Sequence, residues 1–465
     1  MKRGFISLGV ILFILIPTSF AFAGGGFALP GVGSKALSMG GAFRGLADDW
    51  SAAYWNPAGL AYLPNSEFNS CGYILNFRPE YTPYMNLGDA GYDIGYPTMT
   101  YYPEDRAFFL PSFSGFYKFT QMQGFTGGIA FYAPYKLQSR WDLYKPILGF
   151  DNTVPYPTFD QSTNILIWDV HPSVAKTFME DKLGLGLGIS IERADFELRR
   201  LVLVPTDYPR PYDFFPVDES IITDGWGMGF NAGILYKYSP KLQFGLSYRS
   251  PVNIDLSGSM MLEIYYPNIP LTNSQIMGGT TRYKDGNFET TLSLPGEIGF
   301  GVMYKPLEKL TLTSDLSSVN WSRLESIDTK DFTLTQSQSD TLYLGLRDAK
   351  IPFNWKNIIR FSLGGEYMLK EKLAVRGGYF FEKSPIPNST FNLLIPDVGD
   401  KNSINVGLSY RINSIELGYD YQLVLYKKRD FKDLHDVNGD SRYDNMPGNY
   451  KMIYHCSGLS FTYHF

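Results

Sequence analysis

Most of this chain consists of segments in which apolar residues recur at every second position, which is the period of a β-strand. The clearest segment runs from Ile415 to Leu425, where Ile, Leu and Tyr alternate with Glu, Gly, Asp and Gln. Fourteen segments share the pattern, at approximately 66–80, 109–120, 124–138, 164–178, 183–199, 224–238, 241–255, 290–305, 308–322, 357–369, 372–384, 402–413, 415–428 and 449–465. Such alternation through most of a chain predicts an all-β protein.

The connections between these segments alternate between short and long. Residues 121–123, 179–182 and 239–240 form tight connections, whereas seven others run to about twenty residues or more. Repeated long loops are unusual in a compact soluble domain, but a bacterial outer-membrane barrel joins an even number of strands by short periplasmic turns and long extracellular loops. We therefore predict that residues 66–465 form a 14-stranded antiparallel transmembrane β-barrel of the bacterial outer membrane, with seven long extracellular loops.

The two faces of these segments suit a wall between lipid and lumen. Lipid offers no hydrogen-bond partners, so a sheet that spans a membrane must close on itself, with an apolar band outside and a polar wall inside. A soluble β-sandwich or propeller would also have one apolar face. The alternation of loop lengths and the final strand, which ends on Phe465, favour the barrel, because a terminal Phe resembles the signal read by the barrel-assembly machinery.

The composition argues against several other classes of protein. Charged residues make up only 19% of the chain, yet no stretch beyond residue 23 is long and apolar enough for a helical span. A net charge of -5 gives no electrostatic case for nucleic-acid binding. Four His and two Cys leave little material for a metal cluster, and no cofactor is expected. By the alternation, Cys71 should face lipid and Cys456 the lumen, which disfavours a disulfide.

The first 23 residues are expected to be a cleaved signal peptide. Lys2 and Arg3 precede an apolar run that ends in Ala21-Phe22-Ala23, the order of charge, apolar core and small residues that signal peptidase recognises. A transmembrane anchor is the alternative, but the run is shorter than the roughly 20 apolar residues a span requires. The mature chain would then begin at Gly24 and leave the cytoplasm.

Residues 24–65 lie outside the strand series and are expected to form a plug, or hatch, in the lumen. Gly-rich stretches here surround short helix-capable pieces, and no alternating pattern continues through them. The segment resembles the long-chain fatty acid and hydrophobic compound transporter family (FadL/TodX type) in Gly26-Phe27-Ala28-Leu29, in Gly40-Gly41-Ala42 and in Asn56-Pro57-Ala58-Gly59-Leu60. Residues 293–321 and 355–397 resemble the middle and late blocks of the same family, in the same order.

A second family is also similar over part of the chain. Residues 39–60 look like PorV-type barrels, which serve protein secretion, and that is the alternative function. The late block, with Pro385 and Pro387, favours the transporter.

The resemblance implies an outer-membrane transporter of hydrophobic compounds, such as long-chain fatty acids or hydrocarbons. Capture would occur at the third and fourth extracellular loops, which are unusually apolar in this chain and include Leu201, Leu203, Phe214, Phe215, Met261, Ile264 and Tyr265. These side chains could instead pack only on one another as a lid. Binding would follow in a lumenal pocket gated by the N-terminus, with Phe27 as the inserted side chain, or Phe27 could merely anchor the plug.

Release is expected to be lateral, through a kink in the third strand. Gly127, Gly128 and Pro134 interrupt an otherwise apolar run there, and Gly or Pro inside a strand marks a bulge or a missing ladder hydrogen bond. Adaptation of the strand to the plug, without any opening, is the alternative.

Charged residues with lumenal parity have two interpretations. Arg249, Arg360, Arg376 and Arg411 could pair with acidic residues on adjacent strands, because unpaired buried charge is costly, or an unmatched Arg, with Arg376 as the candidate, could bind a ligand carboxylate.

Two further hypotheses are weaker. Asp436, Asn438, Asp440 and Asp444 have part of the oxygen spacing of a calcium loop, although Ser441 and Pro447 replace its Gly and Glu, so a solvated acidic loop is the alternative. A barrel lipid hydrolase would need a Ser and an acidic residue beside one of the His residues, and none stands in a recognisable arrangement, so no enzyme activity is expected. The expected partners are hydrophobic, fatty-acid-like molecules, lipid or detergent, the outer membrane with its lipopolysaccharide, and the barrel-assembly machinery. The barrel is expected to be a monomer.

Overall fold

The computed structural model describes residues 26–84, 99–104, 107–122, 124–143, 161–205, 214–266, 269–270, 275–276, 279–328, 331–333, 350–439 and 443–465. The expected signal peptide and Gly24 lie outside these residues. The helical elements are α2 (Ser34–Ser38), α3 (Ala52–Trp55), and the 3-10 helices η1 (Pro57–Tyr62), η3 (Trp321–Arg323) and η4 (Asn388–Thr390). Among the described residues, none of the helices has the length and apolar character needed to cross a membrane.

Strands make up nearly all of the remaining regular structure. In chain order they are β1 (Glu67–Pro83), β2 (Ala107–Phe119), β3 (Phe125–Trp141), β4 (Gln161–Phe178), β5 (Leu183–Pro205), β6 (Phe214–Ser239), β7 (Leu242–Arg249), β8 (Val252–Tyr266), β9 (Ile269–Pro270), β10 (Gln275–Ile276), β11 (Gly279–Leu294), β12 (Glu297–Leu307), β13 (Leu310–Val319), β14 (Ser326–Ile327), β15 (Asp331–Thr333), β16 (Ile351–Pro352), β17 (Ile358–Lys370), β18 (Leu373–Glu382), β19 (Lys401–Ile412), β20 (Ile415–Tyr426), β21 (Arg429–Phe431) and β22 (Gly448–His464).

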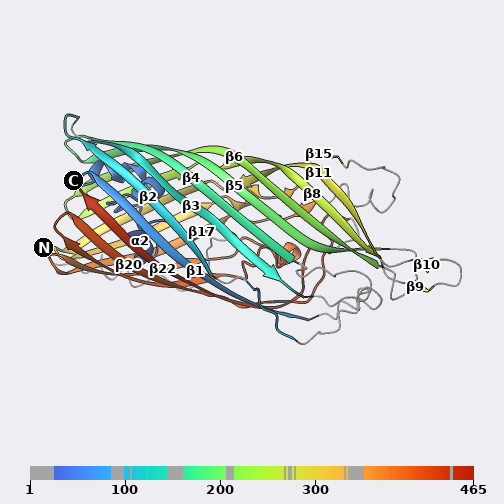
Figure 1. Ribbon diagram of the computed structural model, residues 1–465. Helices are drawn as coiled ribbons and strands as arrows, with labels where there is room; N and C mark the ends of the chain where they lie inside the picture. Colours follow the sequence, from blue (N-terminus) through green and yellow to red (C-terminus); the bar gives the residue numbers. More distant parts are fainter. Residues whose placement is uncertain are drawn as a thin grey trace.

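One antiparallel sheet closes into a tall barrel of fourteen wall strands, as predicted (Figure 1). The sheet contains eighteen hydrogen-bonded strands, but β7 with β8 and β11 with β12 each form a single wall strand, and β15 and β21 are short additions. Closure is made by β1 and β22, which pair from Glu67↔His464 to Pro83↔Gly448. The closed ladder leaves no open sheet edge at this seam, which is the condition for a sheet to lie in lipid.

Two wall strands are each interrupted once. Pro251 lies between β7 and β8, and Pro295 with Gly296 lies between β11 and β12. Proline cannot donate a ladder hydrogen bond, so the pairing changes at these points. On the short-turn side of these interruptions, β12 pairs with β7. On the long-loop side, β11 pairs with β8, and β8 also pairs with β6.

The structure corrects the expected bounds of the third and fourth loops. We expected residues 200–223 and 256–289 to be loops, but β5 and β6 pair continuously from Leu183↔Tyr236 to Pro205↔Phe214, and β8 pairs with β11 through Tyr266. The predicted capture residues 201, 203, 214, 215, 261, 264 and 265 therefore lie on strands. A hairpin satisfies its own backbone groups, so nothing obliges its strands to end at the edge of the membrane.

Side chains alternate between an exposed outer face and the lumen, but the expected parity was wrong for β1. Cys71, Tyr73 and Leu75 are buried and face inward, whereas Ile74 is 56% exposed on the outside. Cys456 is also buried in the interior, and both cysteines are free. They are not opposite each other in the ladder, because Cys71 pairs with Ser460. Both faces of β1 are apolar here since its inner face lines a cavity, so hydrophobicity alone could not orient it.

The segment between residue 26 and β1 lies within the barrel near its turn end, where α2 is visible in Figure 1. Most of its side chains are buried, among them Phe43, Trp50 and Trp55. The chain end at Phe465 lies at the same end of the barrel (Figure 1), and its backbone amide donates to the carbonyl oxygen of Ser66, where β1 is about to begin.

Candidate functional site

The plug is held to the lumenal wall by a buried carboxylate and a buried guanidinium. The backbone amides of Phe43 and Arg44 donate to the same oxygen of Asp315, at 2.9 and 2.8 Å. The Arg44 side chain donates to Ser247 Oγ at 3.1 Å and forms an ion pair with Glu297. Asp315 and Arg44 are each 2% exposed, so the charges are compensated inside the protein. Breaking one partner of such a buried pair is strongly destabilising.

The Asn56-Pro57-Ala58 motif makes the second anchor. Asn56 Nδ2 donates to the carbonyl oxygens of Arg44 at 2.9 Å and of Ile234 on β6 at 3.1 Å. Asn56 Oδ1 accepts from the amide of Ala58 and thereby caps η1, in which Pro57 occupies the first turn. A Cβ at Gly233 would overlap Asn56 Oδ1, so a glycine is needed on the wall at this point. The motif therefore joins two parts of the plug to the barrel.

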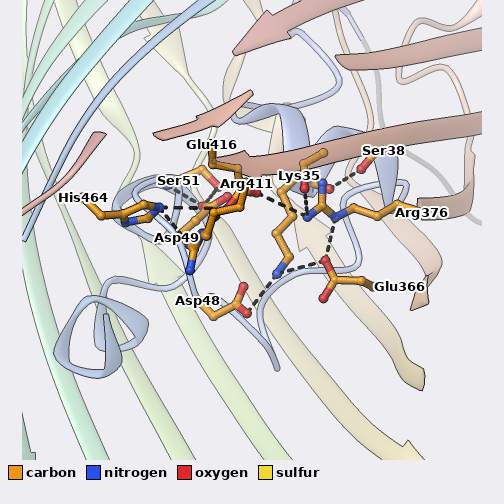
Figure 2. Close-up of polar contacts among 11 residues, drawn as sticks. Lys35, Ser38, Asp48, Asp49, Ser51, Glu366, Arg376, Arg411, Glu416 and His464 are labelled. Carbon is orange, nitrogen blue, oxygen red and sulfur yellow. Dashed lines mark hydrogen bonds and ion pairs between the residues drawn. The ribbon is translucent and has the colours of Figure 1, made fainter. Parts of the chain in front are cut away.

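Figure 2 shows a third anchor, a network of charges at the turn end. Lys35 of α2 lies 2.9 Å from Asp48 and 3.3 Å from Glu366 on β17, and Glu366 accepts from Arg376 on β18 at 2.7 Å. Burial lowers the pKa of Lys35, but the two carboxylates outweigh it and hold that pKa above its usual range. The network continues through Glu416, as Figure 2 shows.

Arg376, proposed above for a ligand carboxylate, lies in this network. Its guanidinium contacts Glu366 and Glu416 and donates to Ser409 Oγ at 2.9 Å. Arg360 is likewise engaged, with Glu382 at 3.3 Å and with the carbonyl oxygen of Pro30 at 2.7 Å. Both arginines are thus paired with carboxylates of the lumenal wall, which favours the first of the two interpretations. A ligand-binding role for Arg376 stays a prediction.

The first described residues of the plug, 26–32, are here called the strap. Phe27 is 2% exposed, and its ring lies 5.5 Å from Tyr135, 5.4 Å from Trp321 and 5.9 Å from Trp355, measured between centroids. Such tilted and edge-to-face contacts are favourable beyond the area they bury. Preceding it, the amide of Gly26 donates to Asp397 Oδ2 at 2.9 Å. Phe27 therefore lies in the lumen, enclosed by aromatic rings.

The strap binds β3 where that strand is irregular. Tyr132 pairs with Asp169 and Tyr135 pairs with Ile167 on β4, so Ala133 and Pro134 together oppose a single residue and form a bulge. The amide of Leu29 donates to the carbonyl oxygen of Pro134 at 3.0 Å, and residue 28 bridges to residue 135. The predicted interruption is therefore located at Pro134.

The wall between β2 and β3 has a gap beside this bulge. These strands pair only from Phe119↔Phe125 to Phe113↔Phe131, and residues 107–112 of β2 pair with β1 alone. Gly127 and Gly128 lie below the gap, in the regular ladder, paired on both sides. They do not cause the interruption, contrary to their assignment as part of the kink. Above the gap, Glu104 N donates to Arg140 O, which joins the first long connection to the top of β3.

Two pockets lie on either side of the strap. The pocket nearer the loops, here the loop-side pocket, is lined by Phe27, Phe77, Lys136, Glu382, Asp397, Lys401 and Met452 among others. The second, here the gap-side pocket, reaches Leu110, Pro111 and Ser112 of β2 and Tyr132 and Ala133 of β3. Leu29, Pro30 and Tyr454 line both pockets, so the strap is the partition between them.

The charges of the loop-side pocket compensate one another. Lys401 lies 2.9 Å from Asp397 and 3.2 Å from Glu382, and all three are buried. Lys136 donates to Asn164 Oδ1 at 2.7 Å. Sequence analysis missed Trp321, Trp355, Asp397 and Lys401 as site residues. Trp321, Trp355 and Asp397 stand in the middle and late blocks that carry the resemblance, which was the available signal.

The predicted capture residues whose side chains the structure describes are buried or half-buried. Leu201, Ile264 and Tyr265 are buried and Met261 is half-buried, and the last three lie on β8 beside β6. The side chains of Leu203, Phe214 and Phe215 lie outside the described residues, although their backbone is in β5 and β6. Capture at this hairpin stays a prediction.

The calcium and hydrolase hypotheses find no support in the described residues. In the last long loop, the amide of Gly439 donates to Asp436 Oδ1 and the amide of Val437 to Asp444 Oδ2, both at 2.7 Å, while Asp440 lies outside the described part. Within that part, no three His, Cys, Asp or Glu side chains are placed to share a metal ion.

In the part of the barrel wall that the structure describes, His171 lies near both a serine and a carboxylate, but the arrangement is not that of a hydrolase. Asp169 Oδ2 and Ser190 Oγ both lie 3.1 Å from Nδ1, and Asn231 Oδ1 lies 3.1 Å from Nε2. A Ser-His-Asp triad needs the serine and the acid on different ring nitrogens.

Comparison with known proteins agrees with this architecture. Residues 14–465 match the family model described as outer membrane protein transport protein (OMPP1/FadL/TodX). The long-chain fatty acid transport protein of Escherichia coli O6:H1 is 30% identical over 206 residues, which is 43% of this chain and 42% of that protein. Outer membrane protein P1 of Haemophilus influenzae is 27% identical over 263 residues, 53% of this chain and 50% of that protein. The chain thus matches half or less of the length of these relatives.

Solved structures share the fold over a larger span. A FadL homologue of Pseudomonas aeruginosa superposes with a TM-score of 0.72 at 20% identity, covering 95% of this chain and all of that one. The toluene transporter TodX of Pseudomonas putida gives 0.70 at 14% identity, covering 94% of this chain and 99% of that one. Given the family match over nearly its whole length and the closed barrel with its lumenal plug, the chain is a member of the OMPP1/FadL/TodX family of outer-membrane proteins.

Proposed function

We propose that this protein carries hydrophobic compounds across the outer membrane and releases them sideways into the bilayer. The observation that carries the proposal is the strap: it lies between two pockets and is hydrogen-bonded to the residue at which β3 bulges, beside the gap in the wall. A displaced strap would join the pockets and uncover the gap. The relatives are named as transporters of long-chain fatty acids and of toluene, which suits this reading.

The route has three stages. A solute is first collected at the loop end, where the β5–β6 and β8–β11 hairpins project and where the apolar residues 201–204, 214–217 and 260–265 lie. It then enters the loop-side pocket in competition with Phe27, whose ring already occupies the aromatic surroundings an apolar ligand would seek. Finally it passes the strap and leaves between β2 and β3. No step requires a continuous aqueous channel, since the plug closes the turn end.

A reversible lock on the strap tests the proposal. Residues 28 and 135 form an isolated bridge, and bridged residues have Cα atoms close enough for a disulfide. In a Cys71→Ser, Cys456→Ser background, Ala28→Cys with Tyr135→Cys should block uptake of a hydrophobic probe when oxidised and restore it after reduction.

The matched control is a cysteine pair away from the strap. Ile404→Cys with Leu423→Cys joins β19 to β20, where these residues are directly opposed. Oxidation of that pair should leave uptake unchanged. Uptake at the wild-type rate through the oxidised strap variant would refute gating by the strap, and with it the proposed route.

A further inference from the structure

The gap-side pocket contains a buried amide whose hydrogen-bonding atoms have no protein partner. Gln422 on β20 lines this pocket and is 1% exposed, yet within the described chain neither its Oε1 nor its Nε2 has a hydrogen-bond partner. The hydroxyl of Tyr454 on β22, 1% exposed and in the same pocket, has no oxygen or nitrogen partner among the described residues, and its polar neighbour there is the thiol of Cys456, a weak hydrogen-bonding group. Buried polar groups are almost always paired, so two such residues in one cavity point to a partner that is not protein.

The arrangement of these residues suits a single headgroup. Gln422 is directly opposite Cys456 in the β20–β22 ladder, and Tyr454 is two residues further along β22, on the same face. An amide offers an acceptor oxygen with two lone pairs and two N–H donors, and a phenol hydroxyl serves as either donor or acceptor. The complementary group is one that donates and accepts from a single small centre, namely a hydroxyl or an uncharged carboxyl group.

The pocket disfavours a charged headgroup. Its lining comprises apolar, hydroxyl, thiol and amide side chains, and none of the described lining residues carries a formal charge. Asp420, two residues from Gln422 on the same face of β20, is fully buried. A carboxylate placed against Gln422 would be desolvated without a cation and would stand near a second carboxyl group, both of which are unfavourable. In this respect it differs from the loop-side pocket, which contains two lysines and two carboxyl groups.

The size of the free space indicates which part of a ligand binds there. With the strap in place, the room left for water-sized groups is about 20 Å³, enough for one hydroxyl-sized centre but not for a hydrocarbon chain. The pocket is lined by Leu110 to Ser112 on β2 and by Ala133 on β3, where these two strands are not paired with each other, so this is the side on which an attached chain would leave. Pro111 also lines an apolar groove on the outer face of the barrel, with Ile74, Phe109, Phe113 and Leu459.

We propose that the gap-side pocket is a headgroup site, in which Gln422 and Tyr454 bind the uncharged hydroxyl or carboxyl group of an amphipathic solute while its apolar chain extends through the β2–β3 gap toward the membrane. This inference rests on the proposed lateral route and adds the class of solute. It identifies the preferred cargo as an amphipath that is neutral when it passes the gap, in preference to a plain hydrocarbon or an ionised fatty acid.

The buried thiol of Cys456 reports on this pocket directly, because it lines the cavity opposite Gln422. In a Cys71→Ser background it is the single thiol of the chain. The experiment measures the rate at which methyl methanethiosulfonate labels Cys456 in lipid nanodiscs, with 1-decanol, n-decane or decanoate at pH 9 present at equal mole fraction in the bilayer. We expect 1-decanol to slow labelling. The other two probes should be about tenfold less effective, because n-decane makes no hydrogen bonds and ionised decanoate has no proton to donate.

Two variants test the residues. Gln422→Met, which keeps the shape of the side chain, and Tyr454→Phe should each reduce the advantage of 1-decanol over n-decane about threefold or more. The matched control is Gln243→Met on β7, which pairs with Lys237 and lies outside the pocket, and it should preserve the advantage. The heat-modifiable mobility of the barrel in gels verifies that each variant is folded.

The outcomes separate this inference from the proposed function. Equal protection by 1-decanol and n-decane in the wild type, or an undiminished preference in folded Gln422→Met, would overturn the headgroup site and leave water as the partner of Gln422. The lateral route would stand in that case if the strap lock still blocked uptake. Failure of the strap lock with a preserved preference for 1-decanol would instead refute the route and retain the site.

Discussion

The backbone amide of Leu29 donates to the carbonyl oxygen of Pro134 at 3.0 Å, so the N-terminal strap is bound at the residue where β3 departs from its regular ladder. An N-terminal segment and a wall strand more than a hundred residues away thus form one unit. A substitution in the strap should therefore alter the conformation of β3, and a substitution in β3 should alter that of the strap. The same contact lies beside the part of β2 that is not paired with β3.

Removing the bulge should close the gap. Deletion of Ala133 combined with Pro134→Ala leaves equal numbers of residues on β3 and β4 between the Tyr132 and Tyr135 pairs, and it keeps later side chains on their present faces. We expect uptake of a hydrophobic probe to fall at least tenfold while binding at the loop end persists. Pro134→Ala alone is the control for the loss of the ring, and it should retain the bulge and most of the uptake. Normal uptake by the deletion variant would contradict the lateral route.

Phe27→Ala should loosen the strap without unfolding the barrel. The variant removes a buried ring in contact with Tyr135, Trp321 and Trp355, a change that costs about 3–5 kcal/mol where a phenylalanine is fully packed. Hydrogen exchange of residues 26–32 should accelerate by orders of magnitude, with the exchange of β20 unchanged. Phe68→Ala, at an outer position that is 47% exposed, serves as control. Unaltered exchange in the strap would show that the aromatic contacts do not hold it.

Asp315→Asn should release the plug from the wall. The carboxylate accepts from two plug amides and faces Arg44, so its neutralisation leaves a buried guanidinium less compensated, a loss of about 3–5 kcal/mol. Ion conductance across a planar bilayer should rise as the plug becomes displaced. Asp224→Asn, on the exposed outer part of β6 with a side chain 58% exposed, should not conduct more than the wild type. An Asp315→Asn variant with the conductance of the wild type would mean that Asn56 and the Lys35 network are enough to hold the plug in place.

The plug should become less stable as the pH rises from 4 to 6. Burial raises the pKa of Asp49 to about 6, although its hydrogen bonds from Ser51 oppose the shift. A carboxyl whose pKa is higher in the folded state than in the unfolded one contributes its stabilisation below the unfolded pKa near 4 and loses it as the pH passes through about 6. Asp49→Asn should therefore match the wild type at pH 4 and exceed it at pH 7, by on the order of 1–3 kcal/mol. Thermal unfolding at both pH values measures this, and equal stabilities at pH 7 would contradict it.

Periodicity predicted the number of wall strands correctly because each face of a membrane strand meets a different solvent. Even so, it could not orient β1, where Tyr73 and Leu75 are apolar and face inward. Periodicity also did not predict where β5 ends and β6 begins, because Leu201 to Val204 continue the hairpin beyond the expected loop boundary. In β1, an apolar side chain suits a lipid-facing position and an apolar cavity equally well. In β5 and β6, an apolar run suits a membrane-spanning strand and a projecting hairpin equally well.

The sequence by itself determined the closed β-barrel, the plug and the family, because alternation, loop lengths and short motifs are local properties that survive without knowledge of the fold. Only the tertiary structure decided that the glycines of β3 lie in an intact ladder, that Arg376 is neutralised by Glu366, and that the Gln422 amide has no hydrogen-bond partner among the residues the structure describes. Each of those facts depends on which side chains meet across the lumen, and that is set by the register of strands far apart in the chain.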